Sequence, residues 1–313
     1  MIHHADPYCS VKGLRIKLIR IYLTDQLDPY DLRITLTHSH HKCKKIFQPA
    51  EEGGARAKKI LDAGALDNVI AIFGLHVKPE IPIGSGVFEA IIRGKGGHAA
   101  LPQLSIDPVM AATNGIISLQ NLVSRKAGPL DPQVLTVAKL QGGAAFDVIP
   151  DYVIIGGTFR ALSREALKHL KQRIEQVIIG QAAVLRCNAS VNFLDEEKPL
   201  YPPTIKNDDL HKVFVDVAGN LIGIYNVNID MQTDMAAEDF AFYQEAIPGY
   251  YFTLGMKNAS SIETVAPLHS PYLVINEDGL PYGAALHASL ATDYLTKYKQ
   301  DVARVVGKYH GQL

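Results

Sequence analysis

The order of strand-like and helix-like segments between residues 87 and 197 narrows the possible folds most. Four short runs there are rich in β-branched and apolar residues, which predicts strands. They span residues 87–93, 133–140, 153–162 and 189–194. Asp107-Pro108 predicts a helix start between the first two strands, and Ser163 predicts another between the last two. Strand, helix, strand, strand, helix, strand is the order of a ferredoxin-like α+β domain.

Strand and helix patterns also alternate outside this block, which predicts an α/β fold with a mostly parallel sheet. The expected strands are 69–77 and 250–254, and the expected helices are 55–63, 209–221, 238–246 and 279–298. We therefore expect a catalytic domain built from residues 46–86 and 198–299, with 87–197 inserted as a lid or dimerisation domain. Residues 1–45 are atypical in pattern and are expected to be non-homologous, with at most a short strand near 32–36, and residues 300–313 form a tail.

Composition and charge exclude several classes of protein. The 31 basic and 32 acidic side chains nearly cancel, which argues against a nucleic-acid or anionic-membrane binder. Three widely spaced cysteines form no disulfide framework. No apolar run approaches the roughly 20 residues of a membrane span, and the wording of the two ends leads us to expect neither a signal peptide nor an endoplasmic-reticulum retention tail. We expect a cytoplasmic protein by default.

Two adjacent carboxylates follow the strand that ends at Ile46-Phe47. Glu51 and Glu52 stand at its carboxyl end, where open α/β sheets place their ligand sites. Neighbouring loop residues can point in different directions, so one carboxylate could hold a metal while the other acts as general base. The same pair would also suit a solvated first helical turn, where acids favour the helix dipole.

Two histidines are candidate metal ligands. His76 ends the apolar 69–77 run, and His269 lies in a loop bracketed by Pro267 and Pro271. A neutral imidazole at such a position suits zinc or manganese. A hydrogen-bonded strand-end histidine and an ordinary turn are the alternatives.

Further candidates are His98, Arg160, Glu238 and Asp239. His98 follows a glycine-rich stretch that permits close backbone approach, and it could bind an oxyanion or a carboxylate. Arg160 ends a lid strand and could clamp a substrate carboxylate, although a solvated arginine is equally compatible. Helix capping alone would explain Glu238 and Asp239.

Six motifs in fixed order resemble the aminoacylase/carboxypeptidase-type dinuclear metallohydrolases, and most of all the plant hydrolases that release indoleacetic acid from amino-acid conjugates. The motifs are Gln48-Pro49-Ala50-Glu51-Glu52-Gly53-Gly54, Gly74-Leu75-His76, Gly94-Lys95-Gly96-Gly97-His98-Ala99, Gly157-Thr158-Phe159-Arg160, Glu238-Asp239-Phe240 and Leu268-His269-Ser270-Pro271.

The resemblance implies a role for each of these residues. Glu51 would be the general base that activates water, and Glu52, His76 and His269 would be metal ligands. His98 and Arg160 would bind substrate, and Glu238 and Asp239 would support the site. The implied cofactor is a divalent metal, Mn²⁺ first and Zn²⁺ second, with up to two ions in a complete site.

The chain departs from the family pattern upstream of Glu51. Members carry an Arg-x-Asp-Met-Asp stretch and a Cys-Gly-His-Asp-x-His stretch there, and neither occurs in this sequence. We therefore expect a catalytic domain that is incomplete at its N-terminus.

The expected function is metal-dependent hydrolysis of a small-molecule N-acyl amino acid, with an indoleacetyl group as acyl part. The alternative is an inactive, truncated remnant that at most binds or dimerises. The lid offers an edge strand for a homodimer, and a plant relative would reside in the endoplasmic reticulum lumen.

Overall fold

The computed structural model describes residues 9–11, 14–16, 20–24, 42–46, 48, 55–67, 69–77, 81–231, 233–255 and 270–310. They form two compact units. The first, the outer unit, takes in Met1–Ile81, Thr204–Gln232 and Asp239–Leu313; the second, the lid unit, takes in Pro82–Pro203 and Thr233–Glu238. No helix in the described part of the chain is both long and apolar enough to cross a bilayer.

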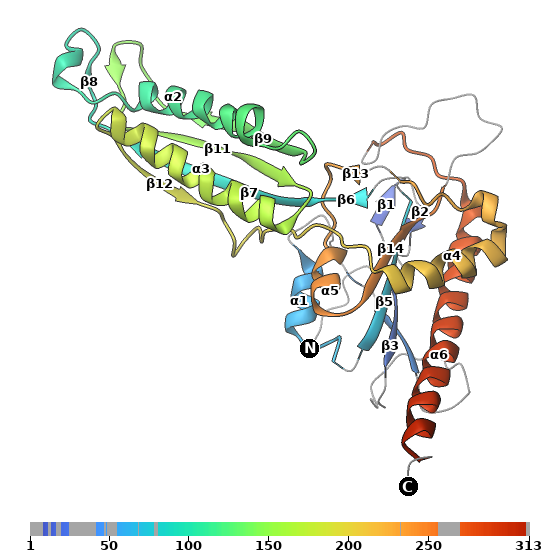
Figure 1. The fold of residues 1–313 in the computed structure, drawn as a ribbon. Coiled ribbons are helices and arrows are strands. Elements are labelled where there is room, and N and C mark those ends of the chain that lie inside the picture. Colours follow the sequence, from blue (N-terminus) through green and yellow to red (C-terminus); the bar gives the residue numbers. More distant parts are fainter. Residues whose placement is uncertain are drawn as a thin grey trace. The chain divides into compact units, whose positions relative to one another are not determined.

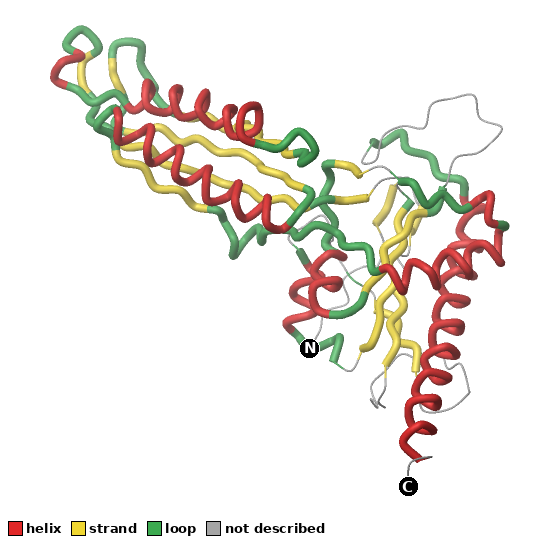
Figure 2. Tube along the Cα trace, in the orientation of Figure 1, coloured by secondary structure: helices red, strands yellow, loops and turns green. Residues whose placement is uncertain are grey.

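The outer unit holds a four-stranded sheet in the order β14-β5-β3-β4 (Figures 1 and 2). The strands are β3 (Arg20–Thr24), β4 (Lys42–Ile46), β5 (Val69–His76) and β14 (Gly249–Thr253), and a separate pair consists of β1 (Cys9–Val11) and β2 (Leu14–Ile16). β14 pairs with β5 in parallel, whereas β3 is antiparallel to both of its neighbours. The described sheet is therefore mixed, with its parallel pair where the apolar 69–77 run predicted it.

Helices cover both faces of this sheet. They are α1 (Arg56–Asp62), α4 (Asp208–Ile222), α5 (Phe240–Ala246) and α6 (Leu280–His310). Ala71 and Phe73 of β5 pack with α4 and α6 in one core, while Gly74 faces Phe240 of α5 on the other side. Side chains alternate along a strand, so one short strand supports both helical layers.

The lid unit is a ferredoxin-like α+β domain, as the element order predicted. Its antiparallel sheet has the order β12-β7-β11-β9, and two helices lie along one face (Figure 1). The strands are β7 (Gly84–Arg93), β9 (Gln133–Gln141), β11 (Tyr152–Ala161) and β12 (Asn188–Asn192), and the helices are α2 (Pro108–Asn121) and α3 (Arg164–Val184). The remaining short strands of the described chain are β6 (Ile81–Pro82), β8 (Gly97–His98), β10 (Val148–Ile149) and β13 (Thr233–Asp234).

Both predicted helix starts in the lid are confirmed. The carboxylate of Asp107 accepts hydrogen bonds from the backbone N–H groups of Val109 and Met110, and the Ser163 hydroxyl accepts one from Ala166. These contacts satisfy backbone donors that have no partner inside the helix. The core between sheet and helices is built from alternate strand residues such as Phe88 and Ile155.

Two expectations about the ends of the chain need correction. Strands β3 and β4 belong to the outer sheet, so part of the 1–45 stretch is continuous with that unit. The lysine-rich sequence Lys42-Cys43-Lys44-Lys45 lacks the apolar alternation by which a strand is predicted. Helix α6 runs to His310, so most of the predicted tail is helical. Val302, Val305 and Val306 continue the helical spacing without a proline. The strand predicted near 32–36 lies outside the described residues.

Candidate active site

The described part of the chain contains five of the eight predicted site residues. His76 and Asp239 belong to the outer unit, and His98, Arg160 and Glu238 belong to the lid unit. Glu51, Glu52 and His269 lie outside the described residues, so their predicted roles stay predictions.

His76 is the last residue of β5, at the carboxyl end of the parallel pair. It stands opposite Thr253 of β14, and its carbonyl accepts a hydrogen bond from Leu254 N at 2.8 Å. Its half-buried ring lies 6.4 Å, centroid to centroid, from the ring of Tyr251. Parallel strands present their carboxyl ends at one edge of a sheet, and this edge is where α/β proteins place ligands.

Asp239 lies fully buried at the start of α5 and connects two segments. Its Oδ2 accepts a hydrogen bond from Ala57 N at 3.0 Å and another from the side-chain amide of Gln48. The hydroxyl of Tyr243 in turn donates to Gln48 Oε1 at 2.7 Å. Asp239 therefore contacts one described residue on either side of the sequence stretch that contains Glu51 and Glu52.

These contacts exclude helix capping as the explanation of Asp239. Helix α5 begins at Phe240, two residues later than predicted, and the Asp239 side chain makes no capping hydrogen bond to it. Instead, the carboxylate accepts from the first turn of another helix, α1. Glu238, the preceding residue, is also buried, with 5% of its surface exposed.

A glycine in β5 allows α5 to lie close to the sheet. A Cβ atom built on Gly74 would lie 2.7 Å from the ring of Phe240, which is closer than carbon atoms approach. Phe240 is fully buried and also packs against Tyr243 and Tyr251. Gly74 therefore fixes the depth of α5, and with it the position of Asp239.

In the lid, a backbone carbonyl orients His98. Strand β8 pairs His98 with Val148 of β10, and His98 Nδ1 lies 3.1 Å from the carbonyl oxygen of Asp147. A carbonyl only accepts, so Nδ1 carries the proton and the exposed ring presents Nε2. His98 can therefore accept a proton at Nε2 when neutral and donate from it only as the imidazolium.

Arg160 is held by the chain that leads to Glu238. Its Nη1 donates a hydrogen bond to the carbonyl oxygen of Met235, within the lid unit. Burial lowers the pKa of Arg160 from its ordinary value, yet a guanidinium stays protonated in proteins. The structure thus excludes a freely solvated arginine and leaves the remaining N–H donors of the fork for an anion.

The chemistry of the donor set fits a divalent metal. Carboxylates and neutral imidazoles are the donors that manganese and zinc accept, and the structure places the imidazole of His76 at the edge where these strands end. Among the described residues, no group of three or more His, Cys, Asp or Glu comes together. Two of the three predicted ligands, Glu52 and His269, lie outside that part.

Sequence reasoning missed Gln48 and Tyr243 as parts of the site. Gln48 opens one of the motifs, but nothing in its neighbourhood predicted an amide contact to a residue 191 positions away. Tyr243 reads as one more apolar residue of α5, and no spacing rule connects it to Gln48. Residues of this kind are found from three-dimensional proximity.

The chain matches the model of peptidase family M20/M25/M40 over residues 32–293. It belongs to this family. The match begins upstream of Ile46, inside the 1–45 stretch. Among curated relatives, this chain is 56% identical to IAA-amino acid hydrolase ILR1-like 4 of Arabidopsis thaliana. The match covers 81% of this chain and 60% of that relative. It is 35% identical to N-acetylcysteine deacetylase of Bacillus subtilis, over 81% of this chain and 67% of that one.

Solved structures agree with this assignment. A dinuclear metal-binding peptidase of the M20 family from Bacillus subtilis is 29% identical, with a TM-score of 0.61 over 78% of this chain and 63% of that one. A putative aminohydrolase from methicillin-resistant Staphylococcus aureus gives a TM-score of 0.65 at 25% identity, over 79% of this chain and 64% of that one. The α/β metallohydrolase fold with an inserted lid is thereby confirmed. The chain spans about 60% of the length of the first curated relatives.

Proposed function

We propose that the chain is a metal-dependent amidohydrolase that releases an acyl group, indoleacetic acid first of all, from an N-acyl amino acid. The observation that carries the proposal is the Asp239 clamp, the contact of its carboxylate with Gln48 and Ala57, which flank Glu51 and Glu52 in the sequence. The relatives support the substrate class, since their names describe hydrolases of IAA conjugates and deacetylases of acyl amino acids.

In this proposal the chain's own residues position the substrate and move the proton. Glu52, His76 and His269 hold the metal, with Mn²⁺ ahead of Zn²⁺. A bound divalent ion supplies Lewis acidity, which makes water a better nucleophile and polarises the amide carbonyl. Glu51 takes a proton from the attacking water and returns it to the departing amine nitrogen.

The lid residues act on the other parts of the substrate. Arg160 pairs with the carboxylate of the amino acid, because a planar guanidinium forms two parallel hydrogen bonds to a carboxylate. His98 donates from Nε2 to the developing oxyanion when its ring is doubly protonated, since Nδ1 is committed to Asp147. A homodimer through an edge strand of the lid sheet belongs to the same proposal, and β9 and β12 are its edges.

The deciding experiment measures metal content and turnover on the purified 313-residue chain supplied with manganese. We expect bound metal and hydrolysis of an indoleacetyl-alanine conjugate, with turnover lowered at least 100-fold in Glu51→Gln, since proton transfer contributes roughly 10²–10⁴-fold to rate. Glu175→Gln, an exposed change on α3, is the matched control and should keep full turnover.

The rival is a non-catalytic remnant of such a hydrolase, and it rests on the departure from the family motifs upstream of Glu51. A folded chain that binds no metal and hydrolyses no conjugate would overturn the proposal and establish the remnant. Turnover equal in Glu51→Gln and the parent would also overturn it, because the reaction would then use another base.

A further inference from the structure

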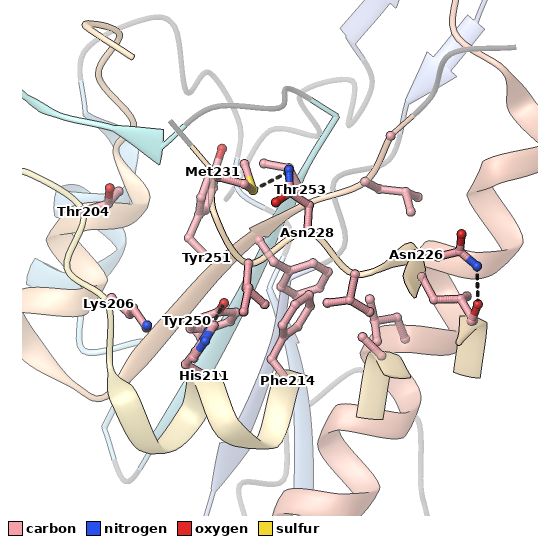
Figure 3. A pocket seen from close by; sticks show the side chains of 18 of the residues that line it. Thr204, Lys206, His211, Phe214, Asn226, Asn228, Met231, Tyr250, Tyr251 and Thr253 are labelled. Carbon is pink, nitrogen blue, oxygen red and sulfur yellow. Dashed lines mark hydrogen bonds between the residues drawn. The ribbon is translucent and has the colours of Figure 1, made fainter. Parts of the chain in front are cut away.

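A cavity of about 340 Å³ lies in the outer unit beside strand β14, and none of the five predicted site residues that the structure describes lines it (Figure 3). Its walls come from α4, from β14 and its continuation to Gly255, and from residues 226–231. Its volume falls in the range of small-molecule pockets, roughly 300–1,000 Å³. The ring of Tyr251, which lines the cavity, lies 6.4 Å from that of His76, and the lining residues Thr253 and Leu254 pair with His76 through the backbone.

One wall of the cavity is aromatic. The ring of Phe214 on α4 lies 5.0 Å from the ring of Tyr250 and 4.9 Å from that of Phe252, centroid to centroid. Phe214 and Phe252 are buried, so the core holds their positions. Such a wall offers a flat apolar surface, which suits a planar ring of the ligand.

The polar end of the cavity is formed by a histidine and a tyrosine. His211 Nδ1 lies 2.7 Å from the hydroxyl of Tyr250. Burial raises the pKa of Tyr250 to about 12, so the hydroxyl keeps its proton at neutral pH. Burial, and then the charge of Lys206, lower the pKa of His211, while Asp208 acts against them. A neutral imidazole that accepts from the tyrosine at Nδ1 carries its proton on Nε2 and can donate it there.

The charge of the lining is positive. Lys206 is the single cation, and none of the described residues that line the cavity is acidic. Its nearest carboxylate partner, Asp208, stands 3.9 Å away with 83% of its side chain exposed, so solvent screens that pair. An anionic group at this end would meet two donors and no opposing carboxylate within the lining.

We propose that this cavity binds a small apolar monocarboxylate, with its ring against Phe214 and Phe252 and its carboxylate accepting from Lys206 Nζ and His211 Nε2. The site goes beyond the proposed amidohydrolase function, because it uses none of the residues assigned there and needs no metal. Arylacetic acids, including the acid that amide hydrolysis would release, belong to this ligand class.

Calorimetric titration of the full chain with indole-3-acetate, in the presence of a metal chelator, tests the proposal. We expect saturable 1:1 binding that weakens at least tenfold in Lys206→Gln, a loss of about 1.4 kcal/mol. Lys212→Gln is the matched control, because Lys212 lies on α4 beside His211, pairs with Asp209 and does not line the cavity. Neutral indole-3-acetamide should bind at least tenfold more weakly than the acid.

A second measurement locates the ligand. The ring resonances of His211 should shift on titration of the parent chain with indole-3-acetate, and the shift should be much smaller in Lys206→Gln at the same ligand concentration. The result of this binding measurement does not depend on the proposed catalysis, since neither metal nor turnover is involved. Absence of saturable binding, equal affinity in Lys206→Gln and Lys212→Gln, or equal affinity for acid and amide would each overturn the proposal.

Discussion

Asp239 shows how a single residue organises this site. Its buried carboxylate receives the Ala57 N–H and the Gln48 amide, which stand on either side of the glutamate segment. The motif order indicated from sequence that Asp239 supports the site, but not through which groups. Its partners lie 182 and 191 positions away in the chain, so only the folded sheet and α5 bring them together.

Asp239→Asn should destabilise the outer unit by about 1–2 kcal/mol, because hydrogen bonds to a charged acceptor contribute about 1.5–3 kcal/mol and neutral ones about 0.5–1.5 kcal/mol. Ala57 N and the Gln48 amide both donate to Oδ2, so an asparagine oxygen in that place keeps both bonds but makes them neutral. Urea unfolding followed by circular dichroism measures the effect as a lower midpoint at an unchanged slope.

Asp62→Asn is the control for this change. Asp62 is exposed and pairs with Lys58 within α1, and such surface pairs contribute little. Equal midpoints for Asp239→Asn and the parent would show that the clamp does not contribute to stability.

At the scale of elements, the sequence predicted the helix starts and the strand that depend on neighbouring residues. Asp107 and Ser163 start helices because their side chains satisfy nearby backbone donors, and the apolar 69–77 run became the buried strand β5. Strand β3 escaped prediction because Arg20–Thr24 lies in a stretch that mixes basic and β-branched residues without a sustained period. The start of α5 was misplaced because Glu238 and Asp239 resemble capping residues, while the Asp239 carboxylate binds another helix.

Gly74→Ala should destabilise the packing of α5 on β5 by about 1–3 kcal/mol, the usual cost of overpacking a core. The added methyl group would meet the Phe240 ring at 2.7 Å, and Phe240 has no exposed side to move toward. The midpoint temperature of thermal unfolding and the proposed turnover rate should both fall, because Asp239 would move together with α5.

Gly180→Ala provides the matched control within a helix. Nothing lies within 4 Å of a Cβ atom at Gly180, which is exposed near the C-terminal end of α3. That change should stabilise the lid by about 0.5–1 kcal/mol, because alanine is the better helix former. The packing argument is wrong if the two substitutions shift stability in the same direction.

At the scale of the whole molecule, the described residues form two separate hydrophobic cores. One lies between the sheet and helices of the lid, around residues such as Ile174, and the other lies between β5, β14, α4 and α6, around Leu290. The strand and helix order predicted this division, because a split βαβ block closes its own sheet. The place of residues 20–24 within the outer sheet was not predictable, since their partners follow them by about 20 to 50 residues.

Two cores predict two unfolding transitions, because each buries its own apolar surface and opens as its own cooperative unit. Ile174→Ala should lower the midpoint temperature of one transition and Leu290→Ala that of the other. Each should cost about 2–5 kcal/mol of unfolding free energy, the range for truncating a fully buried aliphatic side chain. Differential scanning calorimetry of the parent and both variants measures this directly. A single transition that both variants shift equally would mean that the lid and the outer unit unfold as one, and the stability of the lid would then depend on the outer sheet.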